Sequence, residues 1–150
     1  MQSIKIIFLS VFALALVFII SCSDDDGEKK TGMGEVTMNV TGTGTVDPGH
    51  KFLLTFSDLV GIQDYPDGVE VGANESVELE FPRVGEILSI YVSNIPTNCP
   101  DISSSSSTGS QLGFNNNPSD GDHPEAEYES IFLVPVDGSQ GKLQFTIGCD

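Results

Sequence analysis

The feature that most constrains the fold is the alternation of apolar and polar residues at every second position. Val36, Met38 and Val40 alternate with polar residues, and the segment 51–57 repeats the pattern. Successive side chains of a β-strand point to opposite faces, so this period is typical of strands with one buried face. No segment after residue 34 has the period of an amphipathic helix. The sequence therefore predicts an all-β fold.

The strand signal recurs along the rest of the chain, with turn residues between the strands. The expected strands are 35–41, 51–57, 68–71, 76–81, 86–93, 128–136 and 142–148. About seven short strands separated by Gly, Pro, Asn and Asp predict a single antiparallel β-sandwich over residues 35–150. Pro135 cannot donate a ladder hydrogen bond, so we expect the 128–136 strand to lie at an edge or to contain a bulge.

Residues 1–21 have the composition of a signal peptide. Lys5 precedes a mostly apolar run over 6–20, which is short for a membrane-spanning helix of roughly 20 residues. The sequence Ile19-Ile20-Ser21-Cys22 resembles the lipobox of bacterial lipoproteins. The resemblance implies that residues 1–21 are removed and that Cys22 becomes a lipidated amino terminus. The alternative is a retained membrane helix that ends in a buried thiol.

An acidic run directly follows Cys22. Residues 22–34 offer almost no apolar side chain to bury, and their like charges repel one another, so we expect a solvated tether. The run resembles the surface-export signal of Bacteroidota-type lipoproteins, and the alternative is a simple spacer. The resemblance implies processing by the lipoprotein export machinery and display on the outer face of the outer membrane. The residues of the expected signal are Ser23, Asp24, Asp25, Asp26 and Glu28.

The net charge restricts the possible partners. The chain has 22 acidic and 6 basic residues and a formal net charge of −16. Nucleic acids and anionic phospholipids bind through Lys and Arg, so both are disfavoured as ligands. Two or more acyl chains on Cys22 would be enough to hold the protein on the membrane.

Residues 34–149 resemble the small Ig-like or carboxypeptidase-regulatory-like (transthyretin-like) domains of bacterial exported proteins. The features that carry the resemblance are Glu35-Val36-Thr37, the Asp47-Pro48-Gly49 turn, the strand pair at 76–92, the Asn94 to Cys99 segment and the closing Phe145 to Cys149 segment. Such domains are usually non-catalytic. The resemblance therefore implies an architecture and a bridge between Cys99 and Cys149, and it implies no site.

The cysteine count fits that bridge. Once Cys22 carries lipid, Cys99 and Cys149 remain, and a leftover pair in an oxidising compartment most simply forms one disulfide. Cys149 is in phase with the apolar residues of the last strand and so should face the core. Metal binding is the weaker alternative, because neither cysteine has a His or Cys at ligand spacing.

Residues 100–127 depart from the domain pattern. A segment of this length without strand signals is expected to be a flexible loop, and the serine run 103–107 favours disorder. Its second half contains oxygen ligands that suit Ca²⁺, although Pro118 and the absence of flanking helices exclude an EF-hand. The alternative is a solvated acidic loop, and no other cofactor is expected. The calcium candidates are Asn116, Asp120, Asp122 and Glu127.

Catalysis is not expected. His50 and His123 each lie beside a turn, and the motifs of hydrolases, metalloproteases and phosphate-binding loops are missing. The leading hypothesis is a non-catalytic, lipid-anchored surface protein that serves as an interaction or structural module. Its ligand is not identified by the sequence, and a glycan and a protein are the candidates. The alternative is a glycan-binding accessory protein of an outer-membrane uptake system, and an enzyme is the third class. Because the chain has no Trp, Phe114 and Tyr128 are the candidates for a stacking surface.

Overall fold

The computed structural model describes residues 32–58, 65–81, 84–118 and 122–150. Within these ranges the chain forms nine strands and no helix, so the described residues include no helical membrane span. The expected signal peptide, Cys22, the acidic run and the calcium candidate Asp120 lie outside the described residues. The strands are β1 (Gly32–Gly42), β2 (Lys51–Asp58), β3 (Val69–Gly72), β4 (Glu75–Phe81), β5 (Ile87–Ser93), β6 (Asp101–Thr108), β7 (Ser110–Asn116), β8 (Tyr128–Leu133) and β9 (Gly141–Cys149).

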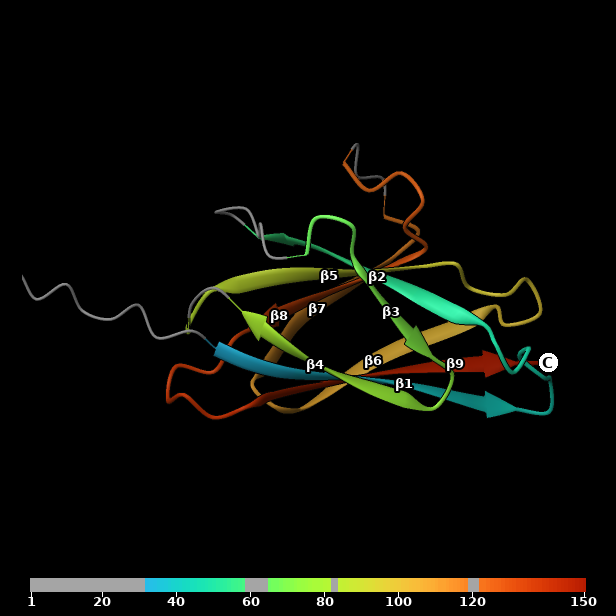
Figure 1. The fold of residues 1–150 in the computed structure, drawn as a ribbon. Helices are drawn as coiled ribbons and strands as arrows, with labels where there is room; N and C mark the ends of the chain where they lie inside the picture. The colour runs from blue at the N-terminus through green and yellow to red at the C-terminus, as the bar shows by residue number, and fades with distance from the viewer. Residues whose placement is uncertain (1–31, 59–64, 82–83, 119–121) are drawn as a thin grey trace, which may run out of the picture.

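The strands form two packed sheets, which confirms the expected β-sandwich (Figure 1). One sheet has the strand order β4-β1-β9-β6, and the other has the order β3-β2-β5-β8-β7. All neighbouring strands are antiparallel except β1 and β9, which run parallel over nine paired positions from Gly34 with Gly141 to Gly42 with Cys149. The hairpins β3–β4 and β6–β7 cross from one sheet to the other at opposite edges of the sandwich.

The core lies between the sheets and follows the two-residue period of the sequence. Phe52, Leu54 and Phe56 of β2 face Val36 and Met38 of β1 across it, and all five are buried. The in-phase residues of β9, Leu143, Phe145, Ile147 and Cys149, are buried as predicted. Burying large apolar side chains is the main favourable term in folding, at about 1.5–3 kcal/mol for each.

The outer face of β5 is covered by the segment 122–127. The ring of His123 stacks on Tyr91 with centroids 4.2 Å apart, and Tyr91 is only 5% exposed. The backbone N–H of Glu127 donates to the carbonyl of Val92 at 2.9 Å, which ties this segment to the end of β5. His50 is also half-buried, with its Nε2 2.7 Å from the carbonyl oxygen of Asn94. Both histidines therefore pack against the domain instead of pointing freely into solvent.

The predicted disulfide is present. Cys99 follows β5 in one sheet, Cys149 ends β9 in the other, and their sulfur atoms are 2.06 Å apart. Both residues are 2% exposed. Cys99 and Cys149 therefore join the two sheets covalently at one end of the sandwich.

The expectation that residues 100–127 form an irregular, flexible loop is wrong for residues 101–116. This segment contains β6 and β7, which pair with β9 and β8 and raise the strand number to nine. The serine run belongs to β6, where the exposed and half-buried residues alternate. Ser104 Oγ lies 2.9 Å from Tyr128 Oη and 3.2 Å from Ser130 Oγ. The Ser104 hydroxyl is hydrogen-bonded by these neighbours, and the β6 backbone is hydrogen-bonded to β9. A serine-rich strand is therefore stable at this edge.

The turn between β6 and β7 depends on Gly109. Its φ is 89°, a conformation that side chains disfavour, and a Cβ atom there would lie 2.6 Å from Cζ of Phe132. Gly109 therefore lets the chain pass from one sheet to the other directly beside the buried ring of Phe132.

Two strand boundaries also differ from the predictions. Gly32–Gly34 belong to β1 and not to the tether, because they pair with Leu79–Phe81 of β4. β8 ends at Leu133, before Pro135, and lies between β5 and β7, so it is an interior strand. The irregularity is instead in β7, where the register shifts between Gln111 and Gly113.

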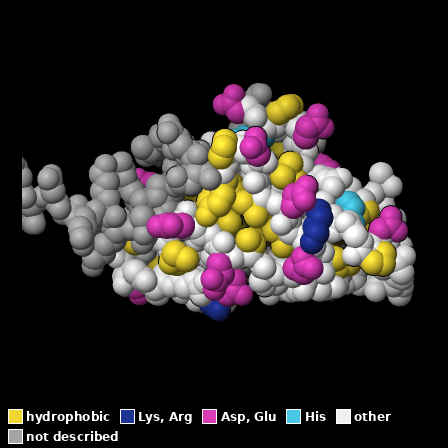
Figure 2. Space-filling model, in the orientation of Figure 1, with side chains coloured by type: hydrophobic (Ala, Val, Ile, Leu, Met, Phe, Trp, Pro, Cys, Tyr) yellow, Lys and Arg dark blue, Asp and Glu magenta, His cyan; other side chains and the backbone are white. Residues whose placement is uncertain are grey.

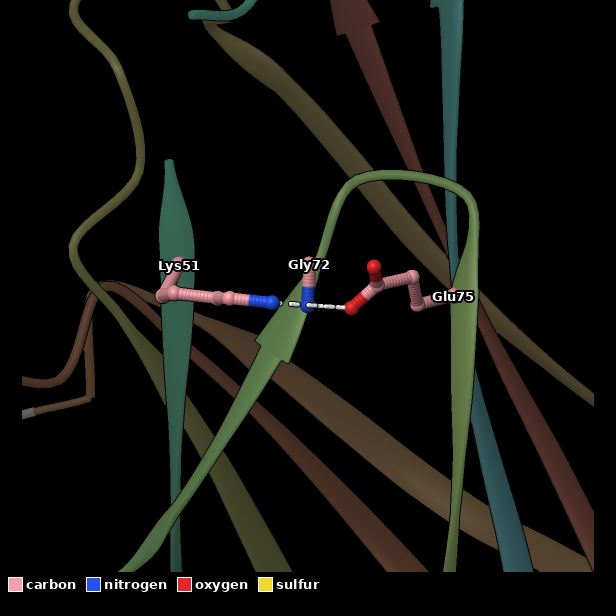
Figure 3. A network of polar contacts seen from close by, with 3 residues as sticks. All are labelled: Lys51, Gly72 and Glu75. Carbon is pink, nitrogen blue, oxygen red and sulfur yellow. Dashed lines mark hydrogen bonds and ion pairs between the residues drawn. The ribbon is translucent and has the colours of Figure 1, made fainter. Parts of the chain in front are cut away.

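A small polar network joins three strands at the β3–β4 edge (Figure 3). Glu75 Oε2 accepts hydrogen bonds from Lys51 Nζ at 2.9 Å and from the Gly72 backbone N–H at 3.0 Å. These interactions, led by the hydrogen bond from Lys51, hold the pKa of Glu75 below its ordinary value of about 4.5. Both side chains are well exposed, so solvent screens the pair.

We expect the disulfide to be the largest single covalent contribution to stability. It closes a loop with a sequence separation of 50, which corresponds to about 4 kcal/mol in the chain-entropy model. Replacing Cys99 and Cys149 together with serine should lower the free energy of unfolding by about that amount in urea titrations of the 31–150 fragment. The exposed substitution Ser107→Ala is the control. Free thiols in the unfolded, non-reduced wild-type fragment would contradict this prediction.

We expect Glu75 to contribute to the pH dependence of stability. Since its pKa is lower in the folded state, its contribution is complete above about 4.5 and is lost as the pH falls through the lowered value. Glu75→Gln should therefore be slightly less stable than the wild type at about pH 7 and equally stable at about pH 2 by urea titration. Glu80→Gln, on the same strand, is the control. An equal difference at both pH values would show that the charge of Glu75 is not responsible.

Candidate binding groove at the β6–β7 edge

A polar groove of about 570 Å³ lies where β6 begins and β7 ends. We define the edge groove by its polar lining residues, which come from both sheets and from the segment before β8. A second hollow of about 280 Å³ shares Pro100, Ile102 and Glu127 with it and extends along the segment 95–99. The polar lining residues of the edge groove are Thr41, Asp101, Ser103, Asn116, Asn117, Glu127 and Thr146.

Backbone hydrogen bonds fix the walls of the groove. The N–H of Asn117 donates to the carbonyl of Glu127 at 2.9 Å, and the N–H of Ile95 donates to Glu127 Oε1 at 2.9 Å. Asn117 has a φ of 59°, a left-handed conformation that asparagine tolerates better than most residues. The disulfide lies next to the lining residues Pro100 and Gly148. The groove is therefore held by covalent and hydrogen-bonded contacts on several sides.

The two aromatic ligand candidates lie together beside the groove. The rings of Phe114 and Tyr128 are nearly parallel, with an interplanar angle of 7° and centroids 6.1 Å apart. Tyr128 is 1% exposed and packs edge-on against Phe145, whereas Phe114 is 65% exposed. Tyr128 is therefore a buried support, and Phe114 is the residue that an incoming molecule can touch.

Strand register places Phe114 next to the groove. Phe114 is opposite Ser130, and Asn116 is opposite Tyr128, so both side chains lie on the same face of β7. Alternate residues on one face of a strand are about 7 Å apart. The exposed ring of Phe114 therefore adjoins the polar lining at Asn116.

The Tyr128 hydroxyl belongs to a buried polar cluster. Its oxygen is hydrogen-bonded to Ser104, and the side-chain amide of Gln111 also donates to Ser104. Burial raises the pKa of Tyr128 above its usual value, and the Ser104 hydrogen bonds oppose this shift. The hydroxyl consequently stays protonated at neutral pH and serves packing.

The calcium candidates are brought together only in part. Asn116 and Glu127 both line the edge groove, whereas the exposed Asp122 is not among its lining residues. Asp120 lies outside the described residues. No group of three or more His, Cys, Asp or Glu residues arranged to hold a metal occurs in the described ranges. A calcium site here stays a prediction.

The charges of the groove are acidic. Asp101 and Glu127 are the carboxylates in its lining, and no Lys or Arg is found among the described lining residues. The opposite edge of the sandwich also shows many acidic side chains and few basic ones (Figure 2). Carboxylates repel an approaching anion over roughly 10 Å before salt screens the interaction. The groove is therefore a better site for neutral or cationic groups than for anions.

Three of the sequence candidates, Phe114, Asn116 and Glu127, lie in or beside the edge groove, whereas none of the candidates lies on its β6 side. The sequence predicts that Asp101 and Ser103 belong to a flexible loop, because the segment is long and its serine run favours disorder. One available signal was the position of Asp101 and Ile102 directly after Pro100, where an apolar residue begins an alternating polar segment. Thr41 and Thr146 lie on the polar faces of two predicted strands, and nothing in the sequence shows that these strands are neighbours.

Comparisons with known proteins support the fold. Neither the protein-family models nor the curated proteins include a match to this chain. Two solved structures of a bacterial adhesin from Mobiluncus mulieris, which contains intramolecular disulfide, isopeptide and ester bond cross-links, are similar, with TM-scores of 0.54 and 0.55. The identity is 11%, and the match covers 81% of this chain and 42% of the adhesin chain. The chain thus shares a β-sandwich fold with part of that adhesin.

We expect Tyr128→Phe to lower the free energy of unfolding by about 1 kcal/mol, because it removes one hydrogen bond to Ser104 and keeps the ring. Ser104 retains its contacts with Ser130 and Gln111, which limits the loss. Urea titration measures the change, and Ser107→Ala on the exposed side of β6 is the matched control. A wild-type stability for Tyr128→Phe would mean that water replaces the hydroxyl contact in solution.

Proposed function

We propose that this chain is a non-catalytic interaction module displayed on the outer face of the outer membrane by a lipid on Cys22. The observation that carries the proposal is the adhesin-like β-sandwich directly behind a lipobox-like sequence and an acidic run. The similar protein is a bacterial adhesin with covalent cross-links, and the disulfide between Cys99 and Cys149 gives this domain one such cross-link.

The candidate site supports binding more than catalysis. Glu127 accepts a backbone hydrogen bond from Ile95, which assigns this carboxylate a structural role in holding the groove. The half-buried His50 and His123 contact the backbone of Asn94 and the ring of Tyr91, respectively. Glu127 and both histidines are thus engaged in contacts within the domain, which supports a binding role more than a catalytic one.

A second candidate function is a glycan-binding accessory protein of an outer-membrane uptake system. The specific observation that favours it is the exposed ring of Phe114 beside a groove of amides, hydroxyls and carboxylates. Both functions require the same location and differ in what the bound molecule is used for.

The membrane attachment is tested by changing the expected lipidation and export residues. Cys22→Ala should release the protein from the membrane fraction or misplace it, because no acyl chain can be attached. Replacing Asp24, Asp25 and Asp26 with alanine should keep the protein on the membrane but protect it from protease added to intact cells. Replacing Glu78 and Glu80 of β4 with glutamine is the control for loss of negative charge. Continued protease accessibility of the triple alanine variant would refute the export signal.

A further inference from the structure

We infer that the edge groove binds a neutral oligosaccharide, with the exposed ring of Phe114 as its stacking surface. This inference rests on the proposed function, because it names the ligand class of the interaction module. One face of a sugar ring would stack on Phe114, and the sugar hydroxyls would form hydrogen bonds along the groove.

The ring of Phe114 is held in place before any ligand arrives. The ring lies nearly parallel to Tyr128, which is itself fixed by an edge contact with Phe145 at 5.9 Å and by a hydrogen bond to Ser104. A stacking surface supported in this way loses little conformational entropy on binding. The face of a sugar ring presents polarised C–H groups, which suit the electron-rich face of an aromatic ring.

The groove supplies the polar contacts that a sugar needs. Asn116 and Asn117 provide amide donors and acceptors, and Ser103, Thr41 and Thr146 provide hydroxyls. Asp101 and Glu127 are acceptors for sugar hydroxyl groups. Amide and carboxylate groups can each engage two neighbouring hydroxyls, so a row of them can recognise the positions of hydroxyls on a ring.

The dimensions fit more than one sugar unit. The volume of about 570 Å³ lies in the usual range of small-molecule sites, roughly 300–1,000 Å³. The adjoining hollow of about 280 Å³ continues past Glu127 along 95–99. An oligosaccharide could therefore pass from Phe114 along the groove toward the disulfide.

The negative charge of the groove lining favours neutral sugars over anionic ones. The carboxylates of Asp101 and Glu127 lie in a lining without Lys or Arg in the described residues, and the whole chain has a net charge of −16. Uronic acids and sulfated sugars would bring further negative charge into this field. Neutral sugars avoid that repulsion and can still accept and donate hydrogen bonds.

The test measures direct binding to the full-length protein purified in detergent. The probes are neutral hexasaccharides of glucose, mannose, galactose and N-acetylglucosamine, with oligogalacturonate and a heparin hexasaccharide as anionic probes. Calorimetric titration should detect saturable binding of at least one neutral probe and weaker or no binding of the anionic ones. Binding of none of the neutral probes, or stronger binding of an anionic one, would overturn the inference.

Variants locate the binding and separate it from folding. Phe114→Ala should weaken binding of the neutral probe by about tenfold or more, and Phe114→Tyr should retain it. The melting temperature of Phe114→Ala should stay close to that of the wild type, because the ring is mostly exposed. Val136→Ala, which changes another exposed apolar residue outside the groove lining, should bind normally. Wild-type affinity of Phe114→Ala would also overturn the inference.

Charge variants test the selection step. Asp101→Asn combined with Glu127→Gln should raise the affinity for the anionic probes relative to that for the neutral probe, because the repulsion is removed. Unchanged discrimination against anions would overturn the charge argument. Surface display of a protein that binds no sugar would leave the proposed function standing, whereas sugar binding by a protein that is not displayed would contradict only the display.

Discussion

The insertion of β9 between β1 and β6 is the constraint on which the rest of the structure depends. β9 is the last strand, and it pairs with β1 over nine positions and with β6 along most of its length. Among the described strands, β6 has no other partner in its sheet. Without β9, the serine strand and the groove that it lines would lose their support. The disulfide at Cys149 fixes the end of this strand to the opposite sheet and so secures both pairings.

The sequence was informative wherever a strand buries one apolar face. The alternation at Val36 and Met38, at Phe52 and Leu54, and along Leu143, Phe145 and Ile147 predicted both the strands and the direction of their side chains. The same phase predicted that Cys149 faces the core, and the cysteine count paired it with Cys99. These predictions succeeded because burial of apolar side chains dominates the choice of register.

The sequence was misleading where a strand is held by pairing and polar contacts. The sequence Ser103–Ser107 does not reveal that its backbone pairs with β9. It also does not reveal that Ser104 forms hydrogen bonds with Tyr128 and Ser130. Composition therefore favoured disorder for a segment that forms β6. The parallel partnership of β1 and β9 was equally hidden, because periodicity reports which face is buried and not which strands are neighbours. The groove lining depends on which strands are neighbours, so the sequence candidates include lining residues only from its β7 and Glu127 side.

For a domain anchored at its amino-terminal end, as proposed above, the parallel arrangement of β1 and β9 has a mechanical consequence. β1 starts at Gly32 at one end of the sandwich, and the edge groove lies toward the other end, where β1 and β9 finish at Gly42 and Cys149 (Figure 1). A force between the tether and a molecule held in the groove would act along the strands. The hydrogen bonds between β1 and β9 lie across that direction and would be loaded together in shear, instead of being unzipped one after another. Under the proposed function, this topology would help the domain to stay folded while a bound molecule pulls on it.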